Sequence, residues 1–271
     1  MTTASIDLPN GATVPVPVVN DVNTPDEIQA MGTDHLKELI DLEDSYWWHR
    51  AKRELVLSLV KEHFPAPGRV LEGGIGSSRT LIELQKCGYK VAGLDIMPEA
   101  VAHAHARGLD DVQEHNLMEP WPVEPQSLNA VLLLDVIEHI SDPIRVLEHA
   151  TSALAPGGGV IITVPAYQWL YGDWDRELGH YRRYSRYDFK RQVSKAGLTI
   201  EKLGFWNSFT LPPAMAIRSY QKCFPKDRPA SFPRVSPTTN QLLGWMAAKE
   251  RQLMKYITVP CGLSLVGVCK K

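Results

Sequence analysis

The chain has 271 residues, of which 44% are apolar and 22% are charged, and its net charge is −2. This composition is typical of a globular protein and excludes disordered and fibrous classes. No uncharged apolar stretch is long enough to span a bilayer, the first basic residue is Lys37, and the four cysteines form no CxxC pair. We therefore expect a cytoplasmic protein with reduced thiols and no bound metal.

Charge is distributed unevenly along the chain. Residues 1–180 contain 12 Lys and Arg and 27 Asp and Glu, whereas residues 181–271 contain 17 and 4. The basic last third either pairs with the acidic body or attracts a phosphate-bearing, nucleic-acid or membrane partner. The composition alone leaves both interpretations open.

The first quarter of the chain predicts an arm followed by helices. Residues 1–24 are rich in Thr, Val, Pro and Asn without a period, which predicts a flexible arm. Helices are expected over 25–66, because Thr24 precedes a proline and two acids, a typical helix start. The aromatic segment Tyr46-Trp47-Trp48 within it is either ordinary core or a cover for a bound ligand.

Residues 67–206 alternate between apolar strands and helices. Strands are predicted at 68–73, 90–95, 112–116, 129–134, 160–164 and 198–205, and helices at 77–87, 98–107, 143–155 and 185–197. This alternation predicts a parallel sheet covered on both faces. A helical insertion is expected over 207–258, and a final strand within 259–271.

Two long connections leave the carboxyl edge of the predicted sheet, where ligands bind in this architecture. One is the aromatic loop 165–184, and the other is the insertion 207–258. We expect the loop to form an acceptor site and the insertion, together with helices 25–66, to form its lid.

The segment Val70–Ser78 predicts a ligand-binding turn between a strand and a helix. Gly74-x-Gly76 is not followed by the third glycine of a dinucleotide site, and no Gly-Lys-Ser/Thr of a P-loop is present. Asp95 ends the next strand, 21 residues after Gly74, where a carboxylate can accept both hydroxyls of a ribose. Because the acid Glu72 precedes the glycines and would repel a pyrophosphate, a ribose beside positive charge, as in S-adenosylmethionine (SAM), fits best.

On these residues the chain resembles the class I SAM-dependent methyltransferases of the type 11/23-like kind. Its first motif falls on Val70–Gly76, and the segments Leu134–His139 and Leu154–Pro165 are similar to later family motifs. The resemblance implies a Rossmann-like, doubly wound, seven-stranded α/β sheet, mostly parallel with an antiparallel last strand, and SAM as the cofactor. It implies cofactor contacts at Glu72, Gly73, Gly74, Gly76, Asp95, Ile96, Asn116, Leu117 and Asp135.

For the acceptor side, His180 is the candidate general base and Asp173 a weaker one. Residues expected to contact an acceptor, neutral or anionic, are Tyr167, Trp169, Tyr171, Tyr181 and Arg182. We predict methyl transfer to an oxygen or nitrogen of a small molecule, such as a natural product or a sugar- or lipid-like metabolite. The alternatives are a nucleic-acid (tRNA) methyltransferase and a protein that binds SAM without transferring methyl.

Overall fold

The computed structural model describes residues 3–7, 13–17, 32–223 and 232–271. The expected helix start at Thr24 lies outside these residues, as do parts of the predicted flexible arm. Within that arm, β1 (Thr3–Asp7) pairs antiparallel with β2 (Thr13–Pro17), two strands that the sequence did not predict. Among the described residues, no helix has the length and apolarity that a membrane crossing requires.

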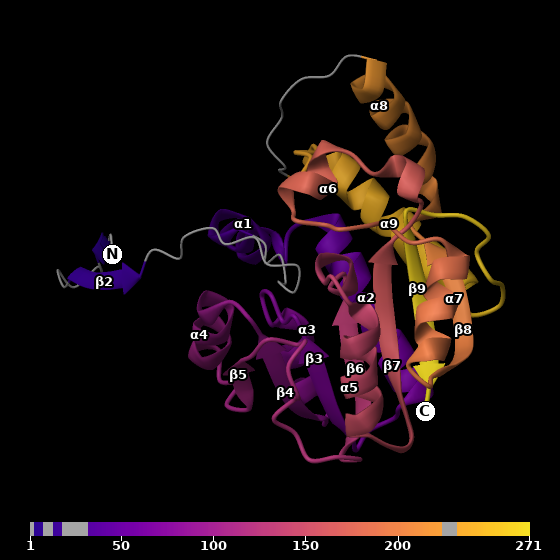
Figure 1. Ribbon diagram of the computed structural model, residues 1–271. Helices are drawn as coiled ribbons and strands as arrows, with labels where there is room; N and C mark the ends of the chain where they lie inside the picture. Colours follow the sequence, from indigo (N-terminus) through magenta and orange to yellow (C-terminus); the bar gives the residue numbers. More distant parts are fainter. Residues whose placement is uncertain (1–2, 8–12, 18–31, 224–231) are drawn as a thin grey trace.

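The main sheet has seven strands in the order β5-β4-β3-β6-β7-β9-β8 (Figure 1). Their bounds are β3 (Arg69–Gly73), β4 (Lys90–Asp95), β5 (Val112–Glu114), β6 (Leu128–Leu134), β7 (Leu154–Pro165), β8 (Thr199–Trp206) and β9 (Ser264–Lys270). The five strands from β5 to β7 are parallel, and β9 runs antiparallel to both of its neighbours. The predicted fold class, including the antiparallel last strand, is confirmed.

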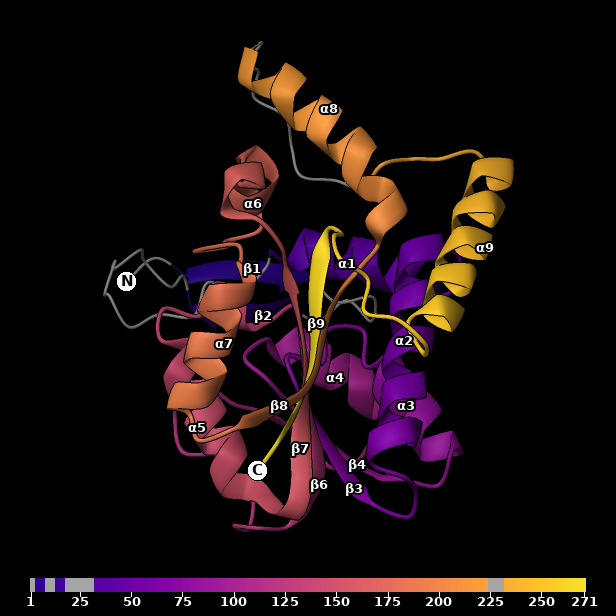
Figure 2. The same ribbon diagram turned by 90° about the vertical axis from the view of Figure 1, so that its right-hand side faces the viewer.

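Helices cover both faces of this sheet. They are α1 (Thr33–Leu42), α2 (Trp47–His63), α3 (Arg79–Lys86), α4 (Pro98–Ala106), α5 (Pro143–Ala153), α6 (Asp173–Glu177), α7 (Arg186–Lys195), α8 (Leu211–Cys223) and α9 (Pro237–Leu253). With the sheet seen nearly edge-on, α5 and α7 lie on one side and α2, α3 and α4 on the other (Figure 2). This is the doubly wound arrangement that alternating strands and helices require.

The core follows from the apolar strands. Val131, Leu132 and Leu133 of β6 are fully buried, because a central parallel strand is covered on both faces. Strand β7 begins at Leu154 rather than at residue 160, because Leu154 pairs with Leu128 before a register shift brings Gly159 opposite Ala130. The segment 156–159, between the helix predicted at 143–155 and the strand predicted at 160–164, is therefore part of β7 and contains a bulge.

The helical insertion lies at the carboxyl edge of the sheet, and the start of α2, which otherwise covers a face of the sheet, reaches the same edge. Helix α9 packs along α2, and α8 rises from the same edge beside α6 (Figures 1 and 2). Asn240 of α9 joins the two packed helices, since its side chain accepts from Trp47 N at 2.9 Å and donates to Ser45 O at 2.9 Å. The N-terminal helices and the insertion thus meet above the strand ends.

Candidate active site

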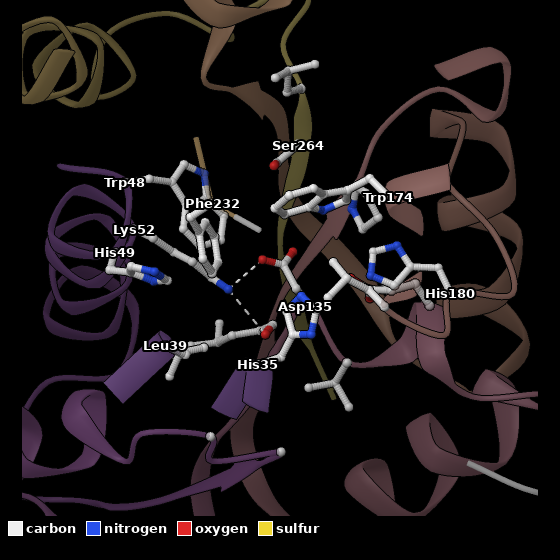
Figure 3. Close-up of a pocket in the computed structure, with 18 of the residues that line it drawn as sticks. His35, Leu39, Trp48, His49, Lys52, Asp135, Trp174, His180, Phe232 and Ser264 are labelled. Carbon is white, nitrogen blue, oxygen red and sulfur yellow. Dashed lines mark hydrogen bonds and ion pairs between the residues drawn. The ribbon is translucent and has the colours of Figure 1, made fainter. Parts of the chain in front are cut away.

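A cavity of about 750 Å³ opens where the parallel strands β3, β4 and β6 end. Its floor is the glycine turn after β3, and its walls come from α2, from the loop after β7, and from α8 and α9. Trp48 and His49 lie on one side of it and Trp174 and His180 on the other (Figure 3). Residues from many separate parts of the chain therefore share one cavity.

The glycine turn is built for close backbone approach. Gly74 has a φ of +72°, and a Cβ there would lie 2.6 Å from Cγ2 of Val136. Gly76 has a φ of +49°, in the left-handed region that glycine adopts most readily. A side chain at position 74 would therefore clash with the turn that follows β6, whereas Gly76 is required by its backbone conformation.

Two buried carboxyl groups flank the turn. Oδ1 of Asp95 accepts from Met97 N at 2.9 Å and its Oδ2 accepts from Gly76 N at 3.1 Å, so its orientation is fixed. Burial raises the pKa of Asp95 despite these hydrogen bonds. Burial also raises the pKa of Glu72 to about 8, and its Oε2 has no hydrogen-bond partner among the described residues.

Lys52 reaches across the cavity from α2 to the end of β6. Its ammonium donates to Oδ2 of Asp135 at 2.5 Å and to Leu134 O at 3.3 Å, and lies 5.0 Å from the ring centroid of Trp48 (Figure 3). Asp135 has a φ of +57° and is held there by Thr163, which accepts from its N–H and donates to its Oδ1. A non-glycine residue in this conformation at a cavity wall is typical of a functional position.

His180 is oriented by a buried acid. Nδ1 of His180 lies 3.0 Å from Oδ1 of Asp175, whose side chain is completely buried and also accepts from Nε of Arg183 at 2.7 Å. Burial alone would raise the pKa of Asp175, but the hydrogen bonds from His180 and Arg183 outweigh it and lower that pKa. An ionised Asp175 therefore holds the imidazole with Nδ1 protonated and leaves Nε2 as the acceptor atom.

The short helical turn η1 (Ile137–His139) brings two further polar side chains to His180. Tyr181 N donates to Glu138 O at 2.8 Å, which fixes the loop that carries His180 against η1. The rings of His139 and His180 meet edge-to-face with centroids 4.5 Å apart. Glu138 is fully buried, and burial together with the charge of Asp135 raises its pKa well above the usual range.

The structure brings about half of the predicted site residues together. Those that line the cavity are Glu72, Gly74, Gly76, Asp95, Ile96, Leu117, Asp135, Asp173 and His180. Those that do not line it are Gly73, Asn116, Tyr167, Trp169, Tyr171, Tyr181 and Arg182. The cofactor side of the prediction is thus largely gathered at one place, whereas the predicted acceptor contacts are not.

The predicted acceptor aromatics have packing roles instead. Tyr167 stacks on Phe205 with centroids 5.3 Å apart, and Tyr171 donates its hydroxyl to His180 O at 2.6 Å. Arg182 lies over the ring of Tyr181 and donates to Ser141 O at 3.0 Å. These contacts hold the 165–184 loop in shape and keep the side chains of Tyr167, Tyr171 and Arg182 out of the cavity lining.

Asn116 also differs from its predicted placement. Its Oδ1 was expected to accept from an adenine amine, but it accepts from Met118 N at 2.9 Å within its own loop. Leu117 stands on the cavity wall beside it. A short Asx turn therefore uses the atom that the resemblance assigned to the cofactor.

The sequence did not predict Lys52 or Glu138 as site residues. Lys52 follows Trp48 by one helical turn, and this spacing was the available signal for a shared face. Nothing in the local sequence indicates that His180, Arg183 and Arg218 surround and bury Asp175. The aromatic wall of Trp174 and Phe232 was likewise not predicted.

The residues present fit SAM. The turn at Gly74 provides backbone access, Asp95 is a fixed carboxylate that suits a pair of hydroxyls, and Glu72 has an unpartnered oxygen that suits an ammonium group. A ligand with a diphosphate is disfavoured, since the acids Glu72, Asp95 and Asp135 all face this end of the cavity.

Comparison with protein families agrees with this geometry. A model described as "Methyltransferase domain" matches residues 46–203, which is more than half of the chain. The protein therefore belongs to this family of methyltransferase domains and has their class I fold. The matched segment begins at Tyr46 and so includes α2 with Lys52 as well as strands β3 to β7 of the sheet.

Curated relatives match over shorter stretches. The chain is 26% identical over 131 residues, 43% of its length, to a "Ubiquinone biosynthesis O-methyltransferase" of Xanthomonas campestris, and covers 55% of that protein. It is 28% identical over 162 residues, 59% of its length, to a "Probable S-adenosylmethionine-dependent methyltransferase" of Mycolicibacterium smegmatis, and covers 62% of it. The chain thus spans about half to three-fifths of the length of these relatives.

Solved structures share the fold. A SAM-dependent methyltransferase from Archaeoglobus fulgidus superposes with a TM-score of 0.57 at 16% identity, covering 89% of this chain and 100% of that one. A methyltransferase of Haloferax volcanii, solved in complex with the activator Trm112, gives a TM-score of 0.57 at 20% identity, covering 88% and 94%. At these identities the likeness concerns the fold alone.

Proposed function

We propose that this methyltransferase acts on a hydroxyl or amine of a small molecule that enters the 750 Å³ cavity from its aromatic side. The observation that carries the proposal is the continuity of this cavity from the glycine turn to the compartment walled by Trp48, Trp174 and Phe232. An enclosed, largely apolar space with a few convergent polar groups suits a compact acceptor. The O-methyltransferase name of several relatives supports the same class.

When bound, SAM supplies an activated methyl group on a sulfonium centre. The chain contributes position, exclusion of water and proton handling. Nε2 of His180 is placed to take the proton of an acceptor hydroxyl, because Asp175 holds Nδ1. This arrangement favours an O-methyl over an N-methyl product, since a neutral amine needs no base before it attacks.

An anionic acceptor would meet few free cations in this cavity. Arg183 and Arg218 line it, but both are paired with Asp175, and Lys52 is paired with Asp135. We therefore propose a neutral or weakly acidic acceptor, such as a phenol. The sequence-based prediction that Arg182 binds an anion would require that residue to leave Ser141 O.

The test is a panel of phenols, catechols, amines and sugars, with release of S-adenosylhomocysteine as the readout. His180→Ala should lower turnover about 10²-fold or more with SAM affinity unchanged. His149→Ala is the matched control, because His149 lies on α5, contacts Met118 O and does not line the cavity. Full turnover of the His180 variant would contradict its role as a base, and a lack of product with any acceptor would favour a SAM-binding protein that transfers no methyl.

The alternative, a nucleic-acid methyltransferase, rests on the basic last third of the chain, which contains 17 Lys and Arg and 4 Asp and Glu. This alternative requires the whole molecule to bind a polyanion, and that binding can be tested separately from methyl transfer. A cytoplasmic location remains our proposal and rests on the four free thiols, Cys87, Cys223, Cys261 and Cys269.

A further inference from the structure

Glu138 is the least satisfied charged group in the cavity. It is fully buried, and neither of its carboxylate oxygens has a hydrogen-bond partner among the described residues. Its acidic neighbours are compensated, since Asp135 pairs with Lys52 and Asp175 pairs with Arg183 and His180. A buried carboxyl group without any hydrogen-bond partner is unfavourable, and a ligand bound beside it would satisfy it.

The side chains around Glu138 are of the kind that bind metal. Glu138, His139 and His180 each offer one ligand atom, and these three atoms all lie within 4.8 Å of one another. In a tetrahedral site with bonds of about 2.0–2.2 Å, ligand atoms are about 3.3 Å apart, so closing this set needs movements of roughly 1 Å. All three residues line the cavity, which leaves remaining coordination positions open to it.

The next shell of residues supports the same conclusion. Histidines that bind metal donate their other ring N–H to a carboxylate or carbonyl, which fixes the ring. Asp175 does this for His180 at 3.0 Å from Nδ1, so Nε2 is the atom turned to the cluster. Tyr181 N bonds Glu138 O and so joins the two ligand-bearing segments by backbone.

We propose that Glu138, His139 and His180 bind a divalent transition-metal cation, beside the methyl acceptor. Two imidazoles and one carboxylate suit Zn²⁺, Mn²⁺, Fe²⁺ or Co²⁺, whereas Mg²⁺ and Ca²⁺ prefer sites built from oxygen alone. The open positions face the acceptor compartment, where a hydroxyl or a pair of adjacent hydroxyls can bind. This inference rests on the proposed function in one respect, the nature of the acceptor.

Metal binding changes the role of His180. With Nε2 bound to the cation, His180 is a ligand and does not itself take the acceptor proton. Asp175 is then a positioning residue for that ligand.

The direct test measures the metal on untagged full-length protein. After treatment with a chelator, the protein is dialysed against Zn²⁺, Mn²⁺ or Co²⁺, and bound metal is quantified by atomic emission. We expect about one equivalent. Glu138→Gln and His180→Asn should each weaken binding by 10-fold or more, and Asp175→Asn by about 10–100-fold.

The controls separate this site from adventitious ones. Glu148→Gln and His149→Asn on α5 change the same residue types away from the cavity and should leave the stoichiometry unchanged. The visible spectrum of bound Co²⁺ should lack thiolate absorption, which excludes binding at the exposed Cys223 and Cys261. Metal bound equally by all variants would overturn the proposal.

SAM affinity of the metal-free protein distinguishes the two proposals. Intact SAM binding and methyl transfer without metal would overturn the metal site and leave the proposed function standing. Metal binding that depends on Glu138 and His180, with no methylated small molecule found, would support the site and contradict the acceptor class.

Discussion

At the scale of single residues, Asp95 shows how the protein prepares its cofactor site. Gly76 N and Met97 N each occupy one lone pair of the carboxylate and fix its orientation. Each oxygen retains capacity for a second hydrogen bond, which is what the two hydroxyls of a ribose require. The side chain of Asp95 is therefore already ordered in the folded protein, so ligand binding does not have to order it.

Asp95→Ala should weaken SAM binding about 10–100-fold, because hydrogen bonds to a charged group contribute about 1.5–3 kcal/mol. Calorimetric titration measures this effect. Asp110→Ala, an exposed acid shortly after α4, is the control and should bind SAM normally. Unchanged affinity in the Asp95 variant, with a native circular dichroism spectrum, would contradict its role at the ribose.

From the raised pKa of Glu72 we expect the free energy of unfolding to depend on pH. Its pKa rises from an ordinary 4.5 to about 8, with burial as the largest cause and the neighbouring charge of Asp95 adding to it. Because the folded protein then holds this proton more tightly than the unfolded chain, the free energy of unfolding falls as pH rises from about 4.5 to 8. Glu72→Gln keeps the shape and removes the ionisation.

Urea denaturation without SAM, at several pH values from 5 to 8, tests this expectation. The wild type should lose stability relative to Glu72→Gln across this window, by at most a few kcal/mol, since one pKa unit corresponds to about 1.4 kcal/mol. Glu138, whose pKa is also raised, contributes equally to both proteins and cancels in the difference. Parallel curves for the two proteins would show that Glu72 is not buried as an acid.

At the scale of elements, the packing of α9 on α2 determines the cavity wall. The N-cap of α2, Tyr46, provides no side-chain cap, and Asn240 of α9 instead accepts from the first helical N–H, that of Trp47. At the other end of α9, Glu250 accepts from Asn207 N and Ser208 N at 2.9 and 2.8 Å. The insertion is thus attached by polar groups at both ends, as suits a lid that must find one position.

Asn240→Ala should lower the free energy of unfolding by about 1–3 kcal/mol, because two backbone groups at the start of α2 lose their partner. Hydrogen exchange should show a faster Trp47 amide and faster exchange in α9. Gln241→Ala, an exposed neighbour on the same helix, is the matched control. Equal exchange in both variants would mean that apolar packing alone holds the two helices together.

The same scale explains what the sequence predicted and what it did not. Most strands and helices from Arg69 to Trp206 follow from local periodicity and turn residues, and their positions were predicted to within a few residues. The exceptions are the start of β7 and the short helix α6, which lies in a segment predicted as a loop. The 165–184 loop has no period, so which of its aromatics face the cavity depends on partners such as Phe205, far away in the sequence. The burial of Asp175 by Arg183, Arg218 and His180 is of the same kind, because it arises only when separate segments meet.

At the scale of the whole molecule, the basic last third faces an acidic body. Arg183 and Arg218 pair with Asp175, Arg251 with Glu54 and Lys202 with Glu62, and each of these acids lies in the first 180 residues. Four of the 17 basic residues in the last third thus pair with acids of the body. These pairs reduce the positive charge that is available to a polyanion.

We therefore expect no tight binding of nucleic acid. Fluorescence anisotropy with tRNA and duplex DNA at about 0.15 M salt should give dissociation constants no better than the non-specific range of roughly 10⁻⁴–10⁻⁶ M, with a shallow salt dependence. Basic side chains that are already paired with acids release few counterions when nucleic acid binds. The dependence of the dissociation constant on salt concentration is therefore as informative as the dissociation constant itself. Arg251→Gln removes one of the paired cations and should leave both quantities unchanged. Nanomolar binding with a steep salt slope would contradict this expectation and favour the nucleic-acid methyltransferase over the small-molecule enzyme.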